Sequence, residues 1–177
     1  MMEDLSLHVL DLVENAAAAG AKRVSVSISE SAARDRLVIR VADDGRGMSE
    51  AERARAFDPF FTTGRKRTGL GLPLLAHTAE ACGGRVALDS VPGRGARVVA
   101  AFRLGHVDRP PLTRMASTMM TLLFGHPDLT MAYRHSRNGR YFRYLRTGRM
   151  AGAPLPPADI LRAERRLREG LRRIGAD

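Results

Sequence analysis

The spacing of apolar residues along this chain predicts where its helices and strands lie. Residues 4–19 carry apolar side chains three to four positions apart, at Leu5, Leu12, Val13 and Ala16. Asp4 or Ser6 is suited to the N-cap, and Gly20 ends the run, so we predict a first helix here. Strict alternation follows in 24–28 and 37–41 and predicts two half-buried strands, the second of which leads directly into Asp43.

The same patterns continue to the end of the domain that we expect near Gly105. Ser49, with a glutamate three positions later, forms a capping box and predicts a short helix. A long helix fits 70–81 and ends at a pair of glycines, with the only cysteine, Cys82, buried at its end. Residues 85–90 and 96–104 then form a hairpin around a Pro-Gly turn.

Beyond two prolines at 110 and 111 the chain predicts a further helix, a hairpin and a last helix. The helix fits 113–124, and the dipeptide Asn-Gly at 138 and 139 joins strands near 129–135 and 140–145. A Gly/Pro-rich linker precedes a last helix that we expect Asp159 to cap. Its apolar stripe predicts that this helix docks on the domain, through Ile160, Leu167, Leu171 and Ile174.

Composition limits the class of protein. The 177 residues are 44% hydrophobic, enough to bury the core of one sizeable domain, or of a small domain with an appendage. The longest apolar candidate, 115–124, is far below the ~18 residues of a membrane span. The N-terminus carries acids where a signal peptide carries bases, so we predict a cytoplasmic protein without a membrane segment. A single cysteine excludes an internal disulfide.

The positive charge is concentrated in the second part of the chain. The net charge is +10; residues 106–177 hold 14 Lys+Arg against 6 Asp+Glu, a net +8, and residues 1–105 hold the remaining +2. The predicted hairpin of the tail mixes arginine with tyrosine and phenylalanine, which suits either nucleic acid or an acidic protein surface. A solvated hairpin is the alternative, since arginine outnumbers lysine 27 to 2 throughout the chain and part of this bias reflects genomic base composition.

Four short motifs carry the chemistry. They are DLVENA at 11–16, DDGRGM at 43–48, FDPFFTT at 57–63 and TGLGL at 68–72. Each is weak alone, but their order within about sixty residues is a strong joint signal for a nucleotide site. Residues 1–105 resemble the GHKL ATPase domain of histidine kinases, gyrase B, Hsp90 chaperones and MutL, in its histidine-kinase-like form.

This resemblance implies the Bergerat ATP-binding fold, an α/β two-layer sandwich of helices over a mixed, mostly antiparallel sheet. We therefore expect two domains: an ATPase domain over 1–105 and a small basic α+β extension over 106–177, arranged as helix, hairpin and helix.

The resemblance also implies roles for residues of the first two motifs. Asn15 matches the family asparagine that holds Mg²⁺ against the ATP phosphates. Asp11, one helical turn earlier, is the candidate catalytic general base; a solvated helix carboxylate is the alternative. Asp43 matches the aspartate that accepts a hydrogen bond from the adenine amine, and Gly45 and Gly47 let the backbone pass close to the base.

The remaining expected ATP-binding residues follow from the later motifs. The glycines that open the helix at 70–81 offer backbone N–H groups to phosphate, and the basic residues 65–67 form a lid over it. The full expected set beyond Asn15 and Asp43 is Gly45, Gly47, Met48, Phe60, Thr68, Gly69, Leu70, Gly71 and Leu72. Two positions depart from the family pattern: Ala18 stands where histidine kinases place a basic residue, and Ala96 where the family often has Thr or Ser.

No separate helical hairpin in this sequence carries a phosphoacceptor histidine. His8 lies on the helix face of Asp11 and Asn15, but no acid follows it. We expect the other four histidines to be ordinary surface or loop residues without metal-ligand spacing: His77, His106, His126 and His135.

The pattern favours a stand-alone ATP-binding regulatory protein in signal transduction. It would bind Mg-ATP and hydrolyse it, or transfer the γ-phosphate to a separate protein partner. The alternatives are a non-catalytic ATP sensor, or a Ser/Thr kinase similar to the anti-sigma kinases, docking a partner through the basic tail. A nucleic-acid-binding module is the third hypothesis. The sequence leaves the partner and the oligomeric state open.

Overall fold

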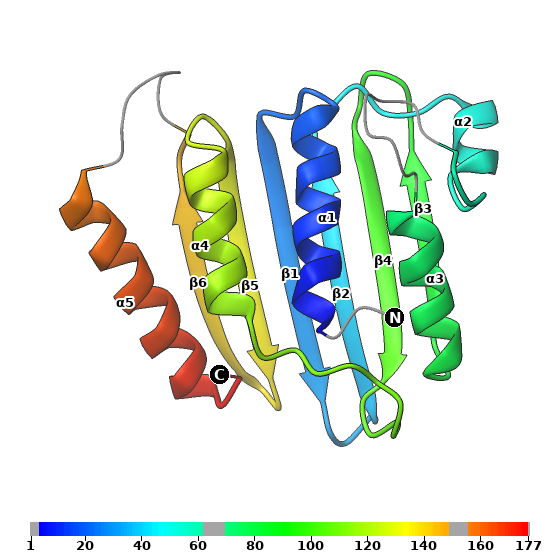
Figure 1. Cartoon of the computed structure of the whole chain (residues 1–177). Helices are drawn as coiled ribbons and strands as arrows, with labels where there is room; N and C mark the ends of the chain where they lie inside the picture. The colour runs from blue at the N-terminus through cyan, green and yellow to red at the C-terminus, as the bar shows by residue number, and fades with distance from the viewer. Residues whose placement is uncertain (1–3, 62–69, 149–155, 177) are drawn as a thin grey trace.

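The computed structural model describes residues 4–61, 70–148 and 156–176. Within these ranges, helices lie over one face of a six-stranded sheet (Figure 1). In chain order the elements are α1 (Leu5–Ala18), β1 (Arg23–Ser31), β2 (Arg36–Asp43), α2 (Glu50–Arg55), α3 (Gly71–Ala81), β3 (Arg85–Ser90), β4 (Ala96–Arg103), α4 (Met115–Gly125), β5 (Thr130–Arg137), β6 (Arg140–Arg146) and α5 (Pro157–Ile174). The predicted α/β sandwich is confirmed.

The sheet is mixed and mostly antiparallel, as predicted. Its strand order is β3-β4-β2-β1-β5-β6, and the pair β1–β5 is the parallel one. Val26 on β1 lies opposite Val41 of β2 on one side and Tyr133 of β5 on the other. The sequence did not predict this parallel pairing, which joins strands about a hundred residues apart.

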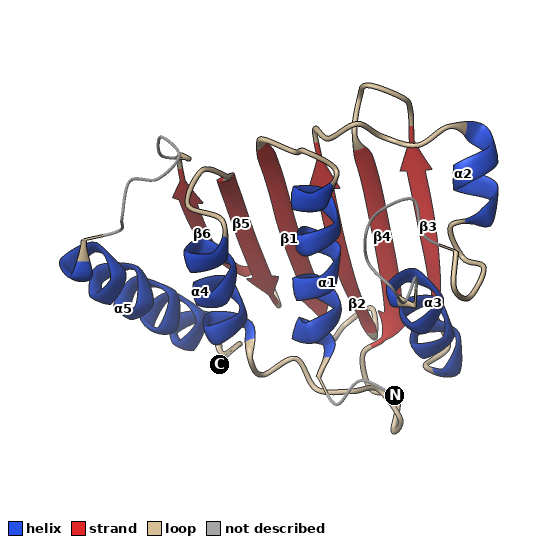
Figure 2. Cartoon of the chain, turned by 45° about the horizontal axis from the view of Figure 1, so that its top comes forward, coloured by secondary structure: helices blue, strands red, loops and turns tan. Residues whose placement is uncertain are grey.

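Helices α1, α3, α4 and α5 cover the same face of the sheet (Figure 2). Alternation turns Val24, Val26 and Ile28 of β1 toward these helices, where all three are buried. The buried residues form one continuous cluster that includes Leu5 of α1, Leu122 of α4 and Leu171 of α5. The opposite face of the sheet carries no described helix.

Asp4 fixes the start of α1 and ties it to the segment before α4. Its Oδ1 atom accepts a hydrogen bond from the Ser6 N–H at 2.8 Å, so Asp4, of the two predicted candidates, is the N-cap. Its Oδ2 atom accepts from the backbone N–H and the hydroxyl of Thr113, at 3.0 and 2.8 Å. Burial favours the neutral carboxyl, but these hydrogen bonds outweigh it and lower the pKa of Asp4.

The expected boundary near Gly105 stays a prediction, although the core and the sheet run across it. The extension has the predicted order of helix, hairpin and helix, and its hairpin lengthens the sheet at the β1 edge. Its turn uses Asn138 and Gly139 with φ of 48° and 84°, the left-handed conformation that such hairpins require.

The prediction that Asp159 caps the last helix is wrong. Helix α5 begins at Pro157, with Pro156 as N-cap, and Asp159 lies in its first turn. Proline is well suited to the first helical position, because the N–H that it lacks has no acceptor there. The helix docks as predicted through Leu167, Leu171 and Ile174, which are buried, whereas Ile160 is only half-buried.

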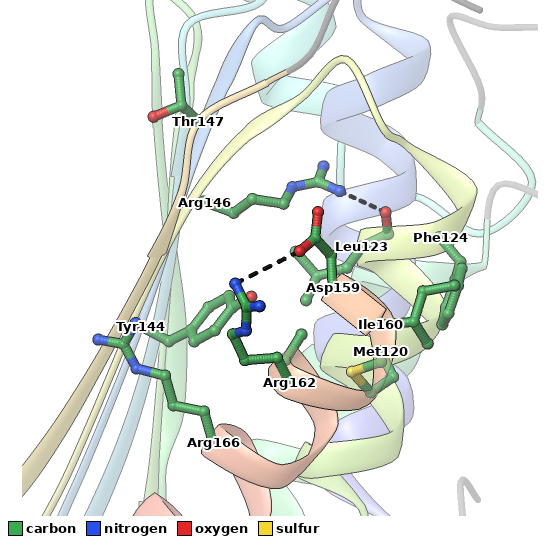
Figure 3. A pocket seen from close by; sticks show the side chains of 11 residues that line it. Met120, Leu123, Phe124, Tyr144, Arg146, Thr147, Asp159, Ile160, Arg162 and Arg166 are labelled. Atoms are coloured by element: carbon green, nitrogen blue, oxygen red, sulfur yellow. Dashed lines mark hydrogen bonds and ion pairs between the residues drawn. The ribbon is translucent and has the colours of Figure 1, made fainter. Parts of the chain in front are cut away.

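A pocket lies between α4, α5 and β6 (Figure 3). The Arg146 guanidinium donates to the carbonyl oxygens of Leu123, His126 and Leu129 at the end of α4, at 2.5–3.0 Å. On α5, Arg162 pairs with Asp159 at 3.6 Å. The Arg146 contacts satisfy the Leu123 carbonyl group, which the end of α4 leaves without a helical partner, and two carbonyl groups of the segment that follows.

The prediction that all four later histidines are surface or loop residues is wrong for His135. Its ring is fully buried on β5, where Nδ1 lies 2.8 Å from the Tyr133 hydroxyl and Nε2 lies 2.7 Å from Glu30 of β1. Burial raises the pKa of Glu30, but the hydrogen bond and charge of His135 and the charge of Arg137 outweigh it, so the net pKa is lowered.

Among the described residues, no helix is both long enough and apolar enough to cross a bilayer.

Candidate nucleotide-binding site

The carboxylate of Asp11 and the amide of Asn15 lie together on one face of α1. Residues four apart are neighbours on a helix, and here the Asn15 Nδ2 group donates to Asp11 Oδ2 at 3.1 Å. Asp11 is half-buried and Asn15 is exposed. This hydrogen bond uses the amide nitrogen of Asn15 and not its oxygen, which is the atom that a cation would require.

The start of α3 lies against the same carboxylate. Gly71 is the first residue of this helix, and a Cβ atom on it would stand only 1.8 Å from Asp11 Oδ2. A side chain at this position would therefore require the Asp11 carboxylate or the start of α3 to shift. The first-turn N–H groups of a helix have no acceptor within it, and they favour negative charge nearby. The fold thus brings together the N-terminus of α3, Asp11 and Asn15, as the motifs predict.

Asp43 ends β2 with its side chain half-buried. Its Oδ1 atom accepts from the Gly45 N–H at 2.8 Å, and the Ala96 N–H is a second donor to the carboxylate. Burial nevertheless dominates and, with help from the negative charge of Asp44, raises the pKa of Asp43. A half-buried carboxylate with a raised pKa is well suited to accept a hydrogen bond from a ligand amine.

The neighbouring Asp44 has a structural role. Its Oδ1 atom accepts from the backbone N–H groups of Lys22 and Arg23 at 2.7 and 2.8 Å, which fixes the start of β1. Among these adjacent aspartates, Asp44 is thus structural and Asp43 is the candidate for binding.

The glycine-rich turn after Asp43 passes beneath the turn between β3 and β4. Gly47 has a φ of 66°, and a Cβ atom on it would lie 2.0 Å from the Val91 carbonyl oxygen. The Met48 N–H donates to the Ser90 hydroxyl at 2.9 Å, and that hydroxyl donates to the Gly95 carbonyl at 2.8 Å. Gly47 is therefore required by its conformation and by close packing.

Backbone contacts connect this turn to the end of α1. The Arg46 N–H donates to the Ala19 carbonyl at 3.0 Å, and Gly45 packs so closely on Ala19 that a Cβ atom would lie 3.0 Å from the same oxygen. The Ala19 N–H in turn donates to the Asn15 carbonyl at 2.9 Å. Backbone hydrogen bonds therefore connect the candidate adenine and metal residues.

Other predicted residues are placed less completely. Thr68, Gly69 and the basic residues 65–67 lie outside the described residues. Leu70 and Leu72 are half-buried at the start of α3, and Leu72 packs against the core. Phe60 is 75% exposed with a φ of 68°, at the end of the described part of its motif. Its role in binding stays a prediction.

Sequence reasoning missed Ser90, whose hydroxyl holds the glycine turn and the β3–β4 turn together, and did not assign this role to Gly95. A Cβ atom on Gly95 would lie 1.9 Å from the Asp43 carbonyl oxygen, so this glycine lets β4 approach the end of β2. The Gly-x-Gly spacing at 93 and 95 is a signal for such a turn. Nothing local distinguishes Ser90 from the other serines of the strands.

His8 is buried in α1, and neither ring nitrogen has a hydrogen-bond partner among the described residues. Burial lowers the pKa of its imidazole, although the Asp11 charge acts in the opposite direction. A ring that is 1% exposed cannot reach a phosphate donor, so the structure gives no support to phosphorylation of His8.

The donor set fits Mg-ATP as the family would hold it. In residues 4–61, 70–148 and 156–176, no three His, Cys, Asp or Glu side chains lie together as a metal-binding group. Mg²⁺ commonly takes one or two protein oxygens and completes its shell with water and phosphate. Asn15 and the adjoining Asp11 can supply such oxygens, and the start of α3 can face the phosphates.

The contacts above connect the asparagine helix α1, the aspartate at the end of β2 and the glycine-led helix α3. The family model described as "Histidine kinase-, DNA gyrase B-, and HSP90-like ATPase" matches residues 3–106. The chain belongs to this family.

Curated proteins with similar sequences include sensor kinases. The alginate biosynthesis sensor protein KinB of Pseudomonas aeruginosa is 38% identical over 93 residues, which are 51% of this chain and 16% of KinB. The sensor histidine kinase ZraS of Salmonella typhimurium is 34% identical over 93 residues, 52% of this chain and 20% of ZraS. The chain thus spans a fifth or less of these curated relatives.

Solved structures show the same fold at low identity. The MutL ATPase domain of Aquifex aeolicus, complexed with ADP, superposes with a TM-score of 0.60 at 14% identity. The match covers 93% of this chain and 69% of that one. The N-terminal domain of a DNA repair protein also gives a TM-score of 0.60, at 11% identity, over 96% of this chain and 57% of that one.

Proposed function

We propose that this protein binds Mg-ATP and uses it as a regulatory ATPase or as a kinase of a separate protein. The observation that supports the proposal is the carboxylate of Asp11, which lies beside the Asn15 amide and against the start of α3. The family match supports ATP as the nucleotide. Turnover and transfer to a protein are the parts that need testing.

Asp11 is the proposed general base. Its carboxylate would take a proton from a water molecule or a protein hydroxyl as that oxygen attacks the γ-phosphorus. The bond from this phosphorus to the bridging oxygen breaks, and ADP leaves with the electron pair. Mg²⁺, when bound, would offset phosphate charge. The Asn15 amide keeps the Asp11 carboxylate in position through the hydrogen bond that it donates.

Asp43 would select adenine. A carboxylate accepts a hydrogen bond from the exocyclic amine of adenine, whereas guanine presents a carbonyl oxygen at the corresponding position. Two acceptors facing each other in a partly buried site are unfavourable, so ATP should bind more tightly than GTP.

A non-catalytic ATP sensor is the second candidate. It is favoured by Ala18, an exposed position on α1 with no cationic group, where related kinases carry a basic residue. In that case ATP would change the conformation of the protein, and a partner would read the change.

The test incubates the protein with γ-labelled Mg-ATP and separates free phosphate from protein-bound label. Asp11→Asn should reduce phosphate release by ~10²-fold or more while nucleotide binding remains. Asn15→Ala should remove Mg²⁺-dependent binding. Glu14→Gln is the matched control on the same helix, because its carboxylate faces His126 at 3.0 Å. Phosphate release that is unchanged by Asp11→Asn would reject the base assignment; binding without release or transfer would favour the sensor.

A further inference from the structure

The helix-free face of the sheet is rich in arginine along its whole width. Side chains alternate along each strand, so the residues between the buried positions point to the helix-free face. Eight arginines do so, and all are exposed: Arg23, Arg36, Arg40, Arg85, Arg97, Arg103, Arg134 and Arg143. Asp89 is the one acidic residue that the described strands place among them.

Most of these guanidinium groups have no acidic partner. Arg103 pairs with Asp35 at 2.6 Å, but no ion pair within 4.0 Å joins any of the others to a described acidic side chain. On the described strands the face thus carries eight arginines against one acidic residue, Asp89, and six of the eight lie in residues 1–105.

The floor between the arginines is made mainly of small residues, with Val38 of β2 and Val99 of β4 as larger apolar side chains on the same face. On the four central strands it is composed mainly of Ser25, Ser27, Ser29, Ala42, Ala101, Ala132 and Ser136. The strand register places Arg40, Ser27, Arg134 and Arg143 in one row across β2, β1, β5 and β6. Neighbouring strands are ~4.8 Å apart, so this row presents cations and a hydroxyl along ~14 Å.

An exposed aromatic ring lies beside the end of this row. Tyr141 of β6 is 54% exposed, and the guanidinium carbons of Arg134 and Arg143 lie 5.7 and 5.1 Å from its ring centre. The other aromatic side chains of the hairpin, Tyr133, Phe142 and Tyr144, are buried against the helices. A stacking surface for a planar ligand is thus available at Tyr141 only, within the described hairpin.

We propose that this face binds single-stranded nucleic acid. Arginines and serine hydroxyls would contact the sugar-phosphate backbone, and one base would stack on Tyr141. An acidic protein segment fits less well, because it offers no base to stack on the exposed Tyr141 ring beside the row of arginines. The inference goes beyond the ATP site, which lies on the helix side of the sheet.

The test measures the fluorescence anisotropy of a labelled oligothymidylate and oligouridylate of about 12 nucleotides, without ATP. Wild-type protein should bind, and affinity should fall ~50- to 100-fold between about 50 and about 200 mM salt if four or five phosphates are contacted. The triple variant Arg40→Gln, Arg134→Gln, Arg143→Gln should bind at least ~10-fold more weakly, with a shallower salt dependence.

A second triple variant provides the matched control. Arg94→Gln, Arg172→Gln, Arg173→Gln removes the same charge from exposed positions elsewhere and should bind almost as wild type. Tyr141→Ala should weaken binding several-fold, and Tyr141→Phe should restore it, because phenylalanine keeps the stacking surface. Thermal unfolding and Mg-ATP titration confirm that each variant is folded.

Four results would overturn the proposal. The first is no binding to either oligonucleotide at the lower salt concentration, and the second is equal loss in both triple variants. The third is tighter binding to a duplex of the same length. The fourth is equally effective competition by polyglutamate, which would assign the face to an acidic protein. A preference between the two oligonucleotides would identify DNA or RNA as the ligand.

Discussion

The Oδ2 atom of Asp11 occupies the space in which a side chain on Gly71 would begin, 1.8 Å from the position of its Cβ. A side chain at the first residue of α3 would therefore force the carboxylate that the proposed chemistry requires, or α3 itself, to shift. Glycine is favoured here by the neighbouring carboxylate and not by an unusual backbone angle, since Gly71 is not among the residues with positive φ.

Gly71→Ala should therefore displace either α3 or the Asp11 carboxylate. We expect ATP binding to weaken by at least ~10-fold and the free energy of unfolding to fall by about 1–3 kcal/mol. Isothermal titration with Mg-ATP and denaturant unfolding measure the two effects. Gly125→Ala at the end of α4 is the control, because no atom lies within 4 Å of its Cβ position. Equal, small effects of the two substitutions would contradict the close approach.

Asp43→Asn should separate binding from stability. Burial raises the pKa of Asp43, so its charged form is disfavoured in the folded protein. This penalty is absent at low pH and grows as pH rises from the unfolded value of 3.8 through the higher folded value. The variant should thus be at least as stable as wild type at neutral pH while binding ATP about 10- to 100-fold more weakly. Urea titrations at acid and neutral pH, with ATP titrations, check both parts.

His8→Leu should reduce the sensitivity of the fold to acid. Burial lowers the pKa of His8 below its ordinary 6.5, so the unfolded chain takes up a proton that the folded protein resists. Stability is therefore full above 6.5 and decreases as pH falls below it, by up to about 1.4 kcal/mol per pH unit. Denaturant titrations at about pH 7 and pH 5 should show a smaller loss in the variant. His77 is exposed, so His77→Gln should behave as wild type. If His8→Leu loses as much stability as wild type on acidification, His8 is not the cause of the acid sensitivity.

The hydrogen bonds from Tyr133 through His135 to Glu30 should couple the two halves of the chain. His135→Leu leaves a buried hydroxyl and a carboxylate without this partner and should cost about 3–5 kcal/mol. Tyr133→Phe removes only one hydrogen bond and should cost about 1–2 kcal/mol. If the halves fold as one unit, hydrogen exchange in α1 and in α5 should accelerate together in His135→Leu. Acceleration limited to 106–177 would indicate separate domains.

Local signals predicted most elements of the fold. The capping box at Ser49 forms as expected, with the Glu52 N–H donating to the Ser49 hydroxyl at 3.2 Å and the Glu52 carboxylate accepting from the Ser49 N–H at 2.7 Å. The place of β5 beside β1 was not predictable, because pairing of distant strands depends on the whole core and not on either segment alone.

The errors have local physical reasons. Pro157 provides the first turn of α5 with a residue that needs no acceptor, and this outweighs the capping preference of Asp159. On β5, His135 lies on the same inward-facing side as Met131 and Tyr133, so the alternation of side chains was the signal that it is buried. For the candidate site, the motifs predicted which residues are brought together, but Ser90 acts through contacts that only the folded chain creates.

The pairing of β1 with β5 has a consequence during synthesis. The ribosome synthesises β1 about a hundred residues before β5. Until β5 is made, the backbone groups along one edge of β1 have no partner strand. Until then Val26 and Ile28 lie beside an open strand edge to which another nascent chain could add. Expression yield should therefore depend on chaperones that hold the unfinished chain, and premature termination before β5 should direct the product toward aggregates.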